Sequence, residues 1–412
     1  MNSAGLQDSS RESRWTDQIL DQMRQTGDPL GDTTVAAIFQ EHGIEAVNSL
    51  WERIRQQNFI SPEGLPPQIY SYLQQSSQLP SWADPKLIAQ GERFFVDRGI
   101  FCLVSLLCAS LPECYVLPNE AAVLATTGSL EVHAYRRVFE TTQLIVDVMR
   151  NGGLRENGTG LQAAQKVRLM HAAIRHLILN APGQNEVTTV PGSFPDIARK
   201  MPPWDVTQHG YPINQEHMAY TLLTFSHVVL RSFSKMKIEV APEEAAAYLH
   251  CWNVVGYAMG VREDLLAMNL KEAECLFSTI RRRQFGQSAD GTALADALVK
   301  AMDKIISREI MGWFSHATVQ RFPPVIMRQL LDRDVIKILK IKPLTFFEWL
   351  MMIVLRILVV IFTWGYRKII VFAGLRFGIH VLNSLTRIPP KWRASLFNIP
   401  DKLRQYINLG DA

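Results

Sequence analysis

The sequence predicts an all-α protein that ends in an apolar, basic helical tail. Apolar residues recur with helical spacing along most of the 412 residues, whereas alternating strand patterns are scarce. The one short β-like run, Val187–Val190, lies in a stretch rich in Pro and Gly, 180–203, that is typical of a long loop. A hydrophobic fraction of 47% with 20% charged residues excludes a chain that is disordered throughout.

The first part of the chain is polar and then helical. Residues 1–15 lack the apolar segment of a secretory signal, so we expect a protein that is not secreted. Asp32-Thr33-Thr34 is predicted to cap a helix over 35–56. The prolines of 80–85 interrupt the pattern, which resumes over 86–99.

The segment 99–111 is apolar on all sides but too short to span a bilayer, so it is predicted to be a buried core helix. Its cysteines and the one that follows, Cys102, Cys108 and Cys114, recur every sixth residue and do not converge on one helix face. We interpret them as small buried hydrophobic residues. Five cysteines also argue against a disulfide framework and favour a reducing compartment.

Several enzyme classes lack support, because the sequence contains no G-x-G-x-x-G, G-x-x-x-x-G-K-[ST], H-E-x-x-H, C-x-x-C or G-x-S-x-G motif. The net charge of +4 is unevenly distributed. Residues 337–412 hold 12 Lys/Arg against 3 Asp/Glu, a balance of +9, which leaves −5 for the other 336 residues. This distribution favours a membrane surface or an acidic partner and gives no support to nucleic-acid binding.

Six of the ten histidines lie between His171 and His250. Over 166–180, Arg168, His171 and Arg175 share one helix face. This face is either a solvated basic surface or a functional one. The apolar neighbours of His171 indicate burial, and a buried imidazole needs a partner.

The segment 204–231 contains a turn followed by a helix that Asn214 is predicted to cap. His217 then falls in the first helical turn, where the helix dipole favours the neutral imidazole that ligates metals. Thr221 lies one turn further on the same face, whereas His227 is turned away from it.

A third helical segment, 245–268, carries an apolar stripe that His250, Asn253 and Gly256 interrupt. Gly256 and Gly260 are small enough for a second helix or a flat ligand to approach closely. Both interpretations stay open from the sequence.

Three blocks in this order, KVRLMHA at 166–172, GYPINQEHMAYTLLTFS at 210–226 and YLHCWNVVGYAMGV at 248–261, resemble the rubber-oxygenase catalytic-domain family. This family includes the latex-clearing proteins and an endoplasmic-reticulum-bound fungal oxygenase. Weaker similarity extends the resemblance to about 80–331. The resemblance implies a globin-like helical core that binds haem b and oxidises an apolar alkene, such as an isoprenoid or lipid, with O₂.

The resemblance also implies roles for individual residues. Arg168 corresponds to the haem-pocket arginine, where it would stabilise a propionate or an anionic oxygen species, and His217 is the candidate proximal ligand of the iron. His171 departs from the family pattern, because latex-clearing proteins have a lysine there that can cap the distal side. It is therefore a possible distal ligand or a pocket residue. The predicted catalytic residues are Arg168 and His171, and the predicted cofactor-binding residues are Arg168, His171, His217, Thr221 and His250.

Alternatives remain open at this point. The insertion at 180–203 shifts the alignment and leaves His209 as a rival ligand. The same residues also suit a non-catalytic haem- or lipid-binding protein, or a non-haem metal oxidoreductase that uses His171, His217 and His250. A purely structural membrane protein is the remaining alternative.

The C-terminal tail contains two apolar runs, 344–364 and 369–385, each interrupted by arginine. Arg356 lies near the middle of the first run, which makes spanning costly. Basic residues at intervals along both runs favour interfacial attachment, with spanning and packing onto the protein's own core as the alternatives. The predicted domains are an N-terminal helical extension (1–79), an oxygenase-like domain (80–335) and a membrane-associated tail (336–412). We expect peripheral or monotopic attachment on the cytoplasmic side of a membrane.

Overall fold

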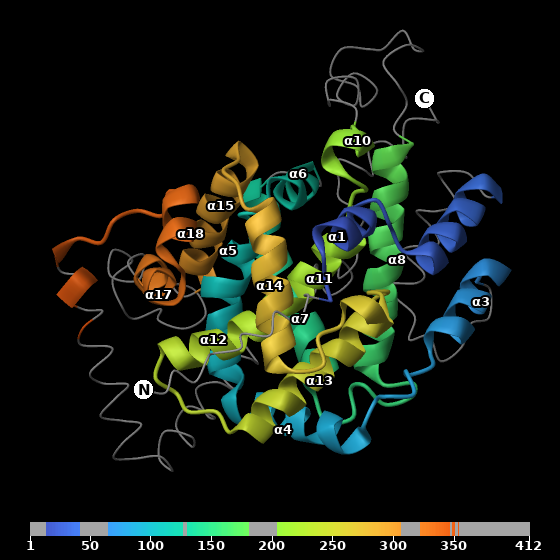
Figure 1. Cartoon of the computed structure of the whole chain (residues 1–412), viewed down its shortest axis with the longest axis horizontal. Helices are drawn as coiled ribbons and strands as arrows, with labels where there is room; N and C mark the ends of the chain where they lie inside the picture. The colour runs from blue at the N-terminus through green and yellow to red at the C-terminus, as the bar shows by residue number, and fades with distance from the viewer. Residues whose placement is uncertain are drawn as a thin grey trace, which may run out of the picture.

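The computed structural model describes residues 14–41, 65–126, 130–180, 204–305, 322–346, 348–350 and 353. Within these ranges every regular element is a helix, which confirms the all-α prediction (Figure 1). A helix also covers 29–41. The other elements are α1 (Asp17–Arg24), α3 (Pro67–Ser76), α4 (Pro85–Ser105), η1 (Leu106–Ser110), α5 (Leu111–Cys114), α6 (Pro118–Thr126), α7 (Leu130–Met149), α8 (Thr159–Leu179), α10 (Val206–His209), α11 (Gln215–Phe225), α12 (His227–Lys235), α13 (Pro242–Ala258), η2 (Glu263–Leu265), α14 (Leu270–Gln284), α15 (Ala289–Ile305), α17 (Phe322–Leu330) and α18 (Arg333–Ile338).

Helices α4 and α13 pack along each other at the centre of the fold. Gly91 on α4 permits this contact, because a Cβ there would lie 2.5 Å from Sγ of Cys251 and 2.6 Å from the carbonyl oxygen of Ala247. Gly256 on α13 has the same role toward α11, where a Cβ would lie 2.4 Å from Cδ2 of Leu222. Of the two sequence interpretations for this glycine, the structure shows close helix packing.

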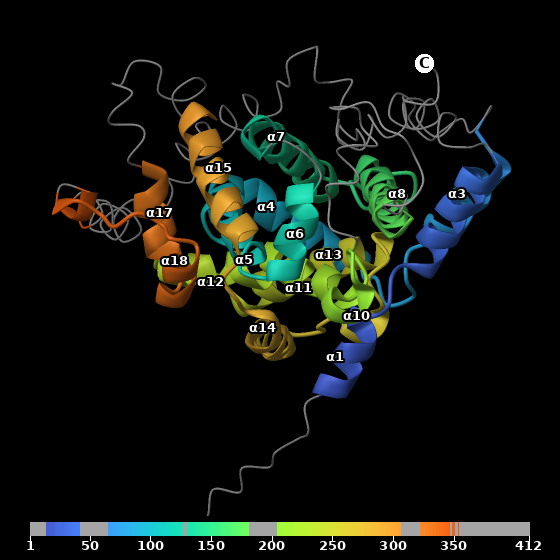
Figure 2. The same cartoon turned by 90° about the horizontal axis from the view of Figure 1, so that it is seen from above.

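Other helices enclose this pair on two sides. On one side α7 packs against α8 and α15; on the other, α11 contacts α12, α14 and α1 (Figure 2). Most buried apolar side chains belong to one core around α4, α11 and α13. A second core lies between α8, α3 and the helix at 29–41 and includes Val35, Ile38, Tyr72 and Leu169.

The helix predicted over 35–56 begins earlier than expected. Helical structure covers 29–41, so Asp32-Thr33-Thr34 lie inside the helix and do not cap it. Proline at the first helical position after an aspartate is a favourable helix start, and Asp28-Pro29 supplies it here. The remainder of the predicted helix and the loop at 181–203, with Val187–Val190, lie outside the described residues.

The segments predicted at 86–99 and 99–111 form one continuous helical rod. Arg98, with φ −128°, is the irregular residue at their junction, and the rod continues through the π-helical η1 into α5. Cys102, Cys108 and Cys114 are buried free thiols, as predicted. By length and composition the rod Pro85–Cys114 could cross a membrane, but half of its most apolar window is buried inside the protein, as expected of a core helix.

An ion network, which we call the tail-root network, joins α18 to the body. Glu113 on α5 is fully buried and accepts from Nη2 of Arg231 at 2.6 Å and from the Tyr220 hydroxyl at 3.3 Å. Arg281 lies 3.3 Å from Glu113 and also donates to Asp334 at 2.9 Å, and Nζ of Lys235 donates to Asp332 at 2.7 Å. The network therefore connects the start of the tail to α11, because Tyr220 belongs to that helix.

Candidate functional site

A buried ion pair joins α8 to the N-terminal part of the chain. Asp28 accepts from Nε and Nη2 of Arg168, both at 2.6 Å. Gly260 follows α13 with φ +87°, and a Cβ there would lie 2.7 Å from Nε of Arg168 and 2.8 Å from the Asp28 carboxylate. Glycine is therefore required both for the backbone conformation and for the close approach of this pair.

Arg175 lies two helical turns after Arg168 on the same face of α8 and holds the segment that leads into α11. It is almost fully buried, donates from Nε to the carbonyl of Pro212 at 2.9 Å and from Nη2 to that of Ile213 at 2.7 Å, and pairs with Asp32. The predicted face of Arg168, His171 and Arg175 is thus covered by 28–32 and is not a solvated surface.

Gln215, the first residue of α11, joins three chain segments. Its amide donates to the carbonyls of Gly27 at 2.9 Å and Gly260 at 2.8 Å, and its side-chain oxygen accepts from the backbone of Arg262 at 2.9 Å. The N-terminus of α11, the end of α13 and the residues before Asp28 are therefore held together by one buried side chain.

Asn214 caps α11, as predicted. Its side-chain oxygen accepts from the backbone N–H of His217 at 2.9 Å, and its side-chain nitrogen lies 3.3 Å from Nδ1 of the same histidine. His217 is 3% exposed, and its Nε2 is buried with no hydrogen-bond partner. Burial, and secondarily the positive charge of Arg24, lowers the pKa of His217 to about 3, so the imidazole is neutral at pH 7.

His171 is a second neutral imidazole. Burial, with the nearby charge of Arg175, lowers its pKa to about 4, although the Asp28 carboxylate opposes this shift. Its Nδ1 is buried and has no hydrogen-bond partner. His171 and His217 therefore each present a free ring nitrogen, the form in which histidine ligates a metal or accepts a hydrogen bond.

Thr221 lies one turn after His217 and donates a hydrogen bond of 2.7 Å to Oε1 of Glu120 on α6. The other carboxyl oxygen, Oε2, is buried without a partner. Burial raises the pKa of Glu120 to about 8, opposed by hydrogen bonds from Thr221 and Cys114, so that this side chain is mainly a neutral carboxylic acid at pH 7.

His250 does not join this arrangement. Its Nε2 accepts from the backbone N–H of Asp84 at 2.9 Å, and its ring packs edge-on against Trp82 at the start of α4. Among the described residues no three His, Cys, Asp or Glu side chains are close enough to hold a metal ion, so His171, His217 and His250 do not form the three-ligand set of the non-haem alternative. His209, the rival ligand, packs at a tilt against Trp204, with 5.3 Å between ring centroids.

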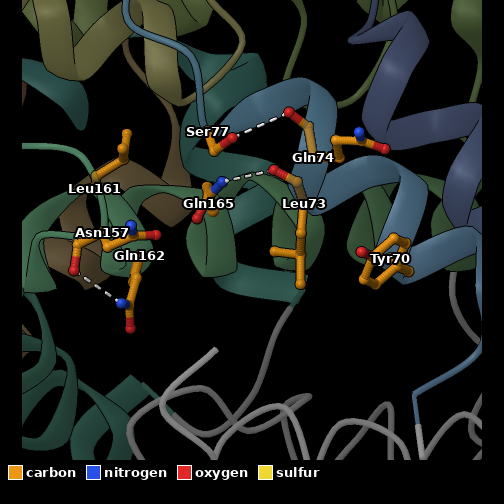
Figure 3. Close-up of a pocket in the computed structure, with 8 residues that line it drawn as sticks. All are labelled: Tyr70, Leu73, Gln74, Ser77, Asn157, Leu161, Gln162 and Gln165. Carbon is orange, nitrogen blue, oxygen red and sulfur yellow. Dashed lines mark hydrogen bonds between the residues drawn. The ribbon is translucent and has the colours of Figure 1, made fainter. Parts of the chain in front are cut away.

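A surface cavity of about 230 Å³ lies between α3 and α8 (Figure 3). Its lining is mostly amide and hydroxyl groups, with Tyr70 and Leu73 on α3 and Leu161 on α8 supplying the apolar part. Neither His171 nor His217 lines it. We therefore place the candidate site at the buried imidazoles and not at this cavity.

Sequence patterns did not identify three residues of the site, Asp28, Gln215 and Glu120. Asp28 precedes a proline, Gln215 follows a cap, and Glu120 falls in a short helix. Neither Asp28 nor Gln215 has a local signature of function. Glu120 alone carried a usable signal, since an acidic residue in the apolar stretch that follows α5 is unusual.

Comparisons with known proteins identify the family and the fold of the chain. A family model described as "ER-bound oxygenase mpaB/B'/Rubber oxygenase, catalytic domain" matches residues 93–357. Over 298 aligned residues the chain is 24% identical to the Rubber oxygenase of Streptomyces sp. (strain K30). The alignment covers 71% of this chain and 68% of that protein. The solved structure of Latex Clearing Protein in the closed state superposes with a TM-score of 0.67 at 21% identity, covering 89% of this chain and 91% of that one. This structural likeness establishes the fold.

Proposed function

We propose that this chain, which belongs to the family of endoplasmic-reticulum-bound and rubber oxygenase catalytic domains, uses haem b and O₂ to oxidise a hydrophobic alkene. Membership of this family makes it an oxidoreductase of the oxygenase class. The proposed substrates are isoprenoids or unsaturated lipids. The named relative, a rubber oxygenase, supports this substrate class.

The observation that carries the haem proposal is the state of His217. One neutral imidazole from the protein is enough to hold a haem iron, because the porphyrin nitrogens supply the other ligands. The buried, uncharged and unpartnered Nε2 of His217 fits this requirement. The donor set in the described part of the chain also fits, since a haem does not need a cluster of three protein ligands.

The surrounding residues have separable tasks. Asn214 fixes the first turn of α11 and limits rotation of the His217 ring through its contact at Nδ1. His171 would be a neutral group of the haem site that holds or accepts a proton at Nδ1. The buried apolar side chains of α11 and α13, which include Leu222 and Trp252, would exclude water from the substrate. Haem, when bound, would supply the activation of O₂.

An absorption spectrum tests this proposal. The full-length protein, purified from a haem-replete host, should show a Soret band, and His217→Ala should remove it. His209→Ala is the matched control, because His209 was the rival ligand, and it should leave the band unchanged. Wild-type protein without a Soret band, or a band lost in His209→Ala and kept in His217→Ala, would contradict the assignment.

We further propose that the tail attaches the protein peripherally to the cytoplasmic side of a membrane. Phe346, Trp349 and Leu350 are 70%, 48% and 43% exposed, and Phe346 and Trp349 stack on each other. Three exposed lysines, Lys337, Lys340 and Lys342, precede them. Aromatic side chains beside cationic ones are typical of an interfacial anchor on anionic lipid.

Truncation after Pro343 tests the attachment and keeps the buried Leu339 and Ile341. The truncated protein should leave the membrane fraction while the full-length protein stays there. Lys271→Glu, which changes an exposed lysine elsewhere on the body, is the control. This variant should partition into the membrane fraction as the wild type does. Equal partitioning of the truncated and full-length proteins would contradict the proposal.

A further inference from the structure

Arg24, the last residue of α1, lies beside the candidate site although it precedes the matched family region 93–357. Its carbonyl accepts from the backbone of Tyr211 at 3.0 Å, and its Nη2 donates to the carbonyl of Gln208 at 2.6 Å. Its side chain thus crosses the turn that leads into α11.

A glycine in this turn leaves space for the Arg24 side chain. Gly210 has φ +75°, and a Cβ there would lie 2.6 Å from Cγ and 3.2 Å from Nε of Arg24. A glycine at this position therefore removes the side chain that would otherwise displace the guanidinium. The same turn contacts the cap of α11, since the side-chain nitrogen of Asn214 donates to the carbonyl of Tyr211 at 2.9 Å.

The guanidinium of Arg24 has unused hydrogen-bonding capacity. Its Nε is buried and has no hydrogen-bond partner, and Nδ1 of His209 in the same turn is also buried and unpartnered. Buried polar atoms in native proteins are nearly always hydrogen bonded, so an unpaired donor of this kind indicates a missing acceptor.

Neighbouring arginines differ from Arg24 in this respect. Arg168 is paired with Asp28, Arg175 with Asp32, and Arg283 with Glu216 at 3.0 Å. Glu216 is the acid nearest in sequence to His217, but Arg283 and Gln284 occupy its two oxygens. No ion pair of Arg24 is found among the described residues, which leaves this guanidinium as a cation at the turn before α11 with an unused donor.

We propose that Arg24 binds a carboxylate of the ligand held at His217, which in haem is a propionate. The identity of this carboxylate rests on the proposed function. A guanidinium is suited to this task because its planar donors match the geometry of a carboxylate. The N-terminal helix α1 would then complete a site whose other residues lie on α8 and α11, and Arg24 would take the role that the resemblance gave to Arg168.

Reconstitution with two porphyrins tests the proposal. The full-length protein, freed of haem, is titrated with haem and with haem dimethyl ester, in which both propionates are masked. We expect Arg24→Gln to weaken haem binding roughly 10- to 100-fold, the loss expected for one hydrogen bond to a charged group, and to leave ester binding unchanged. Arg24→Lys should restore part of the affinity for haem.

Two controls separate this role from a structural one. Arg262→Gln removes an exposed arginine that is paired with Asp264 and should bind both porphyrins as the wild type does. Thermal unfolding of the haem-free Arg24→Gln variant shows whether the fold persists.

The outcomes are distinguishable. An equal loss for haem and ester, or no loss for either, would overturn the role of Arg24 while leaving the haem proposal intact. A wild-type protein that binds neither porphyrin would overturn the proposed function itself, and the propionate assignment with it.

Discussion

The Thr221 hydroxyl and the Glu120 carboxyl form a buried pair, with 2.7 Å between Oγ1 and Oε1. Since Oε2 has no partner and no cation pairs with Glu120 among the described residues, the neutral acid is the stable form. One turn below His217, the fold therefore keeps a proton on a carboxyl group at neutral pH.

Protonation of Glu120 should make stability depend on pH. Burial raises its pKa from 4.5 to about 8, so the folded state holds a proton that the unfolded state loses between these values. Stability contributed by this proton is therefore complete below about pH 4.5 and falls as pH rises toward 8. Glu120→Gln should remove this slope and stabilise the protein by about 3 kcal/mol at pH 7 relative to the wild type. Urea unfolding of the wild type and the variant at pH 5 and pH 8 gives the free energy of unfolding at each pH and therefore the slope.

Glu140 adds a slope of the same sign, because burial raises its pKa to about 7, so the difference between wild type and variant is the quantity to compare. Exposed Glu239→Gln is the control and should keep the wild-type slope. A Glu120→Gln variant with the wild-type slope would show that Glu120 is ionised in the folded protein.

Asp28→Asn should leave the Arg168 guanidinium buried without its counter-charge. Breaking a buried ion pair at one partner costs roughly 3–5 kcal/mol. Asp264→Asn breaks the same kind of bidentate pair, with Arg262, at a site where both side chains are almost half exposed, and it should cost about 0–1 kcal/mol. Chemical denaturation of both variants gives the comparison. Equal losses would show that burial of the Asp28–Arg168 pair is energetically unimportant.

Asn214→Ala should destabilise α11 by about 1 kcal/mol through loss of its N-cap and should also weaken haem retention, because the His217 ring loses its neighbour at Nδ1. Asn269→Ala removes the equivalent cap of α14, where the side chain accepts from the backbone of Glu272 at 2.9 Å. This control should lose similar stability and keep haem. Melting temperature and the rate of haem loss separate the two effects, and equal haem loss in both variants would contradict the orienting role of Asn214.

Gly91→Ala should force α4 and α13 apart, since the new methyl group meets backbone as well as sulfur at about 2.5 Å. We expect a loss of roughly 1–3 kcal/mol from overpacking. Gly99→Ala, on the same helix, has its nearest obstacle 3.9 Å away at Phe95 and should be neutral or stabilising by about 0.5–1 kcal/mol. Thermal unfolding of the two variants is sufficient, and a tolerated Gly91→Ala would mean that the two helices can separate at little cost.

Local patterns predicted the parts of the fold that local interactions determine. Helical periodicity indicated α8, and the cap at Asn214 placed His217 in the first turn of α11. The predicted cap at Asp32 was wrong because proline at position 29 starts the helix one turn earlier. When two nearby residues can each start a helix, spacing alone does not show at which of them the helix begins.

Contacts between distant segments were not predictable in this way. Asp28 and Arg168 are 140 residues apart, and Arg24 reaches a turn 184 residues further along the chain. The periodicity of the sequence does not predict such pairs, because they depend on how the helices pack in the tertiary structure. The catalytic roles of Arg168 and His171 and the cofactor-binding roles of Arg168, His171, His217, Thr221 and His250 stay predictions. The domain limits at 79 and 335 also stay predictions.

The tail-root network has a mechanical consequence. Asp332 and Asp334 tie α18 to Arg281 and Lys235, and Glu113 extends the connection to Tyr220 on α11. These contacts hold α18 in a fixed position relative to the helix that carries His217. If the proposed anchor engages a bilayer, α18 and α11 would therefore keep one orientation relative to each other during attachment.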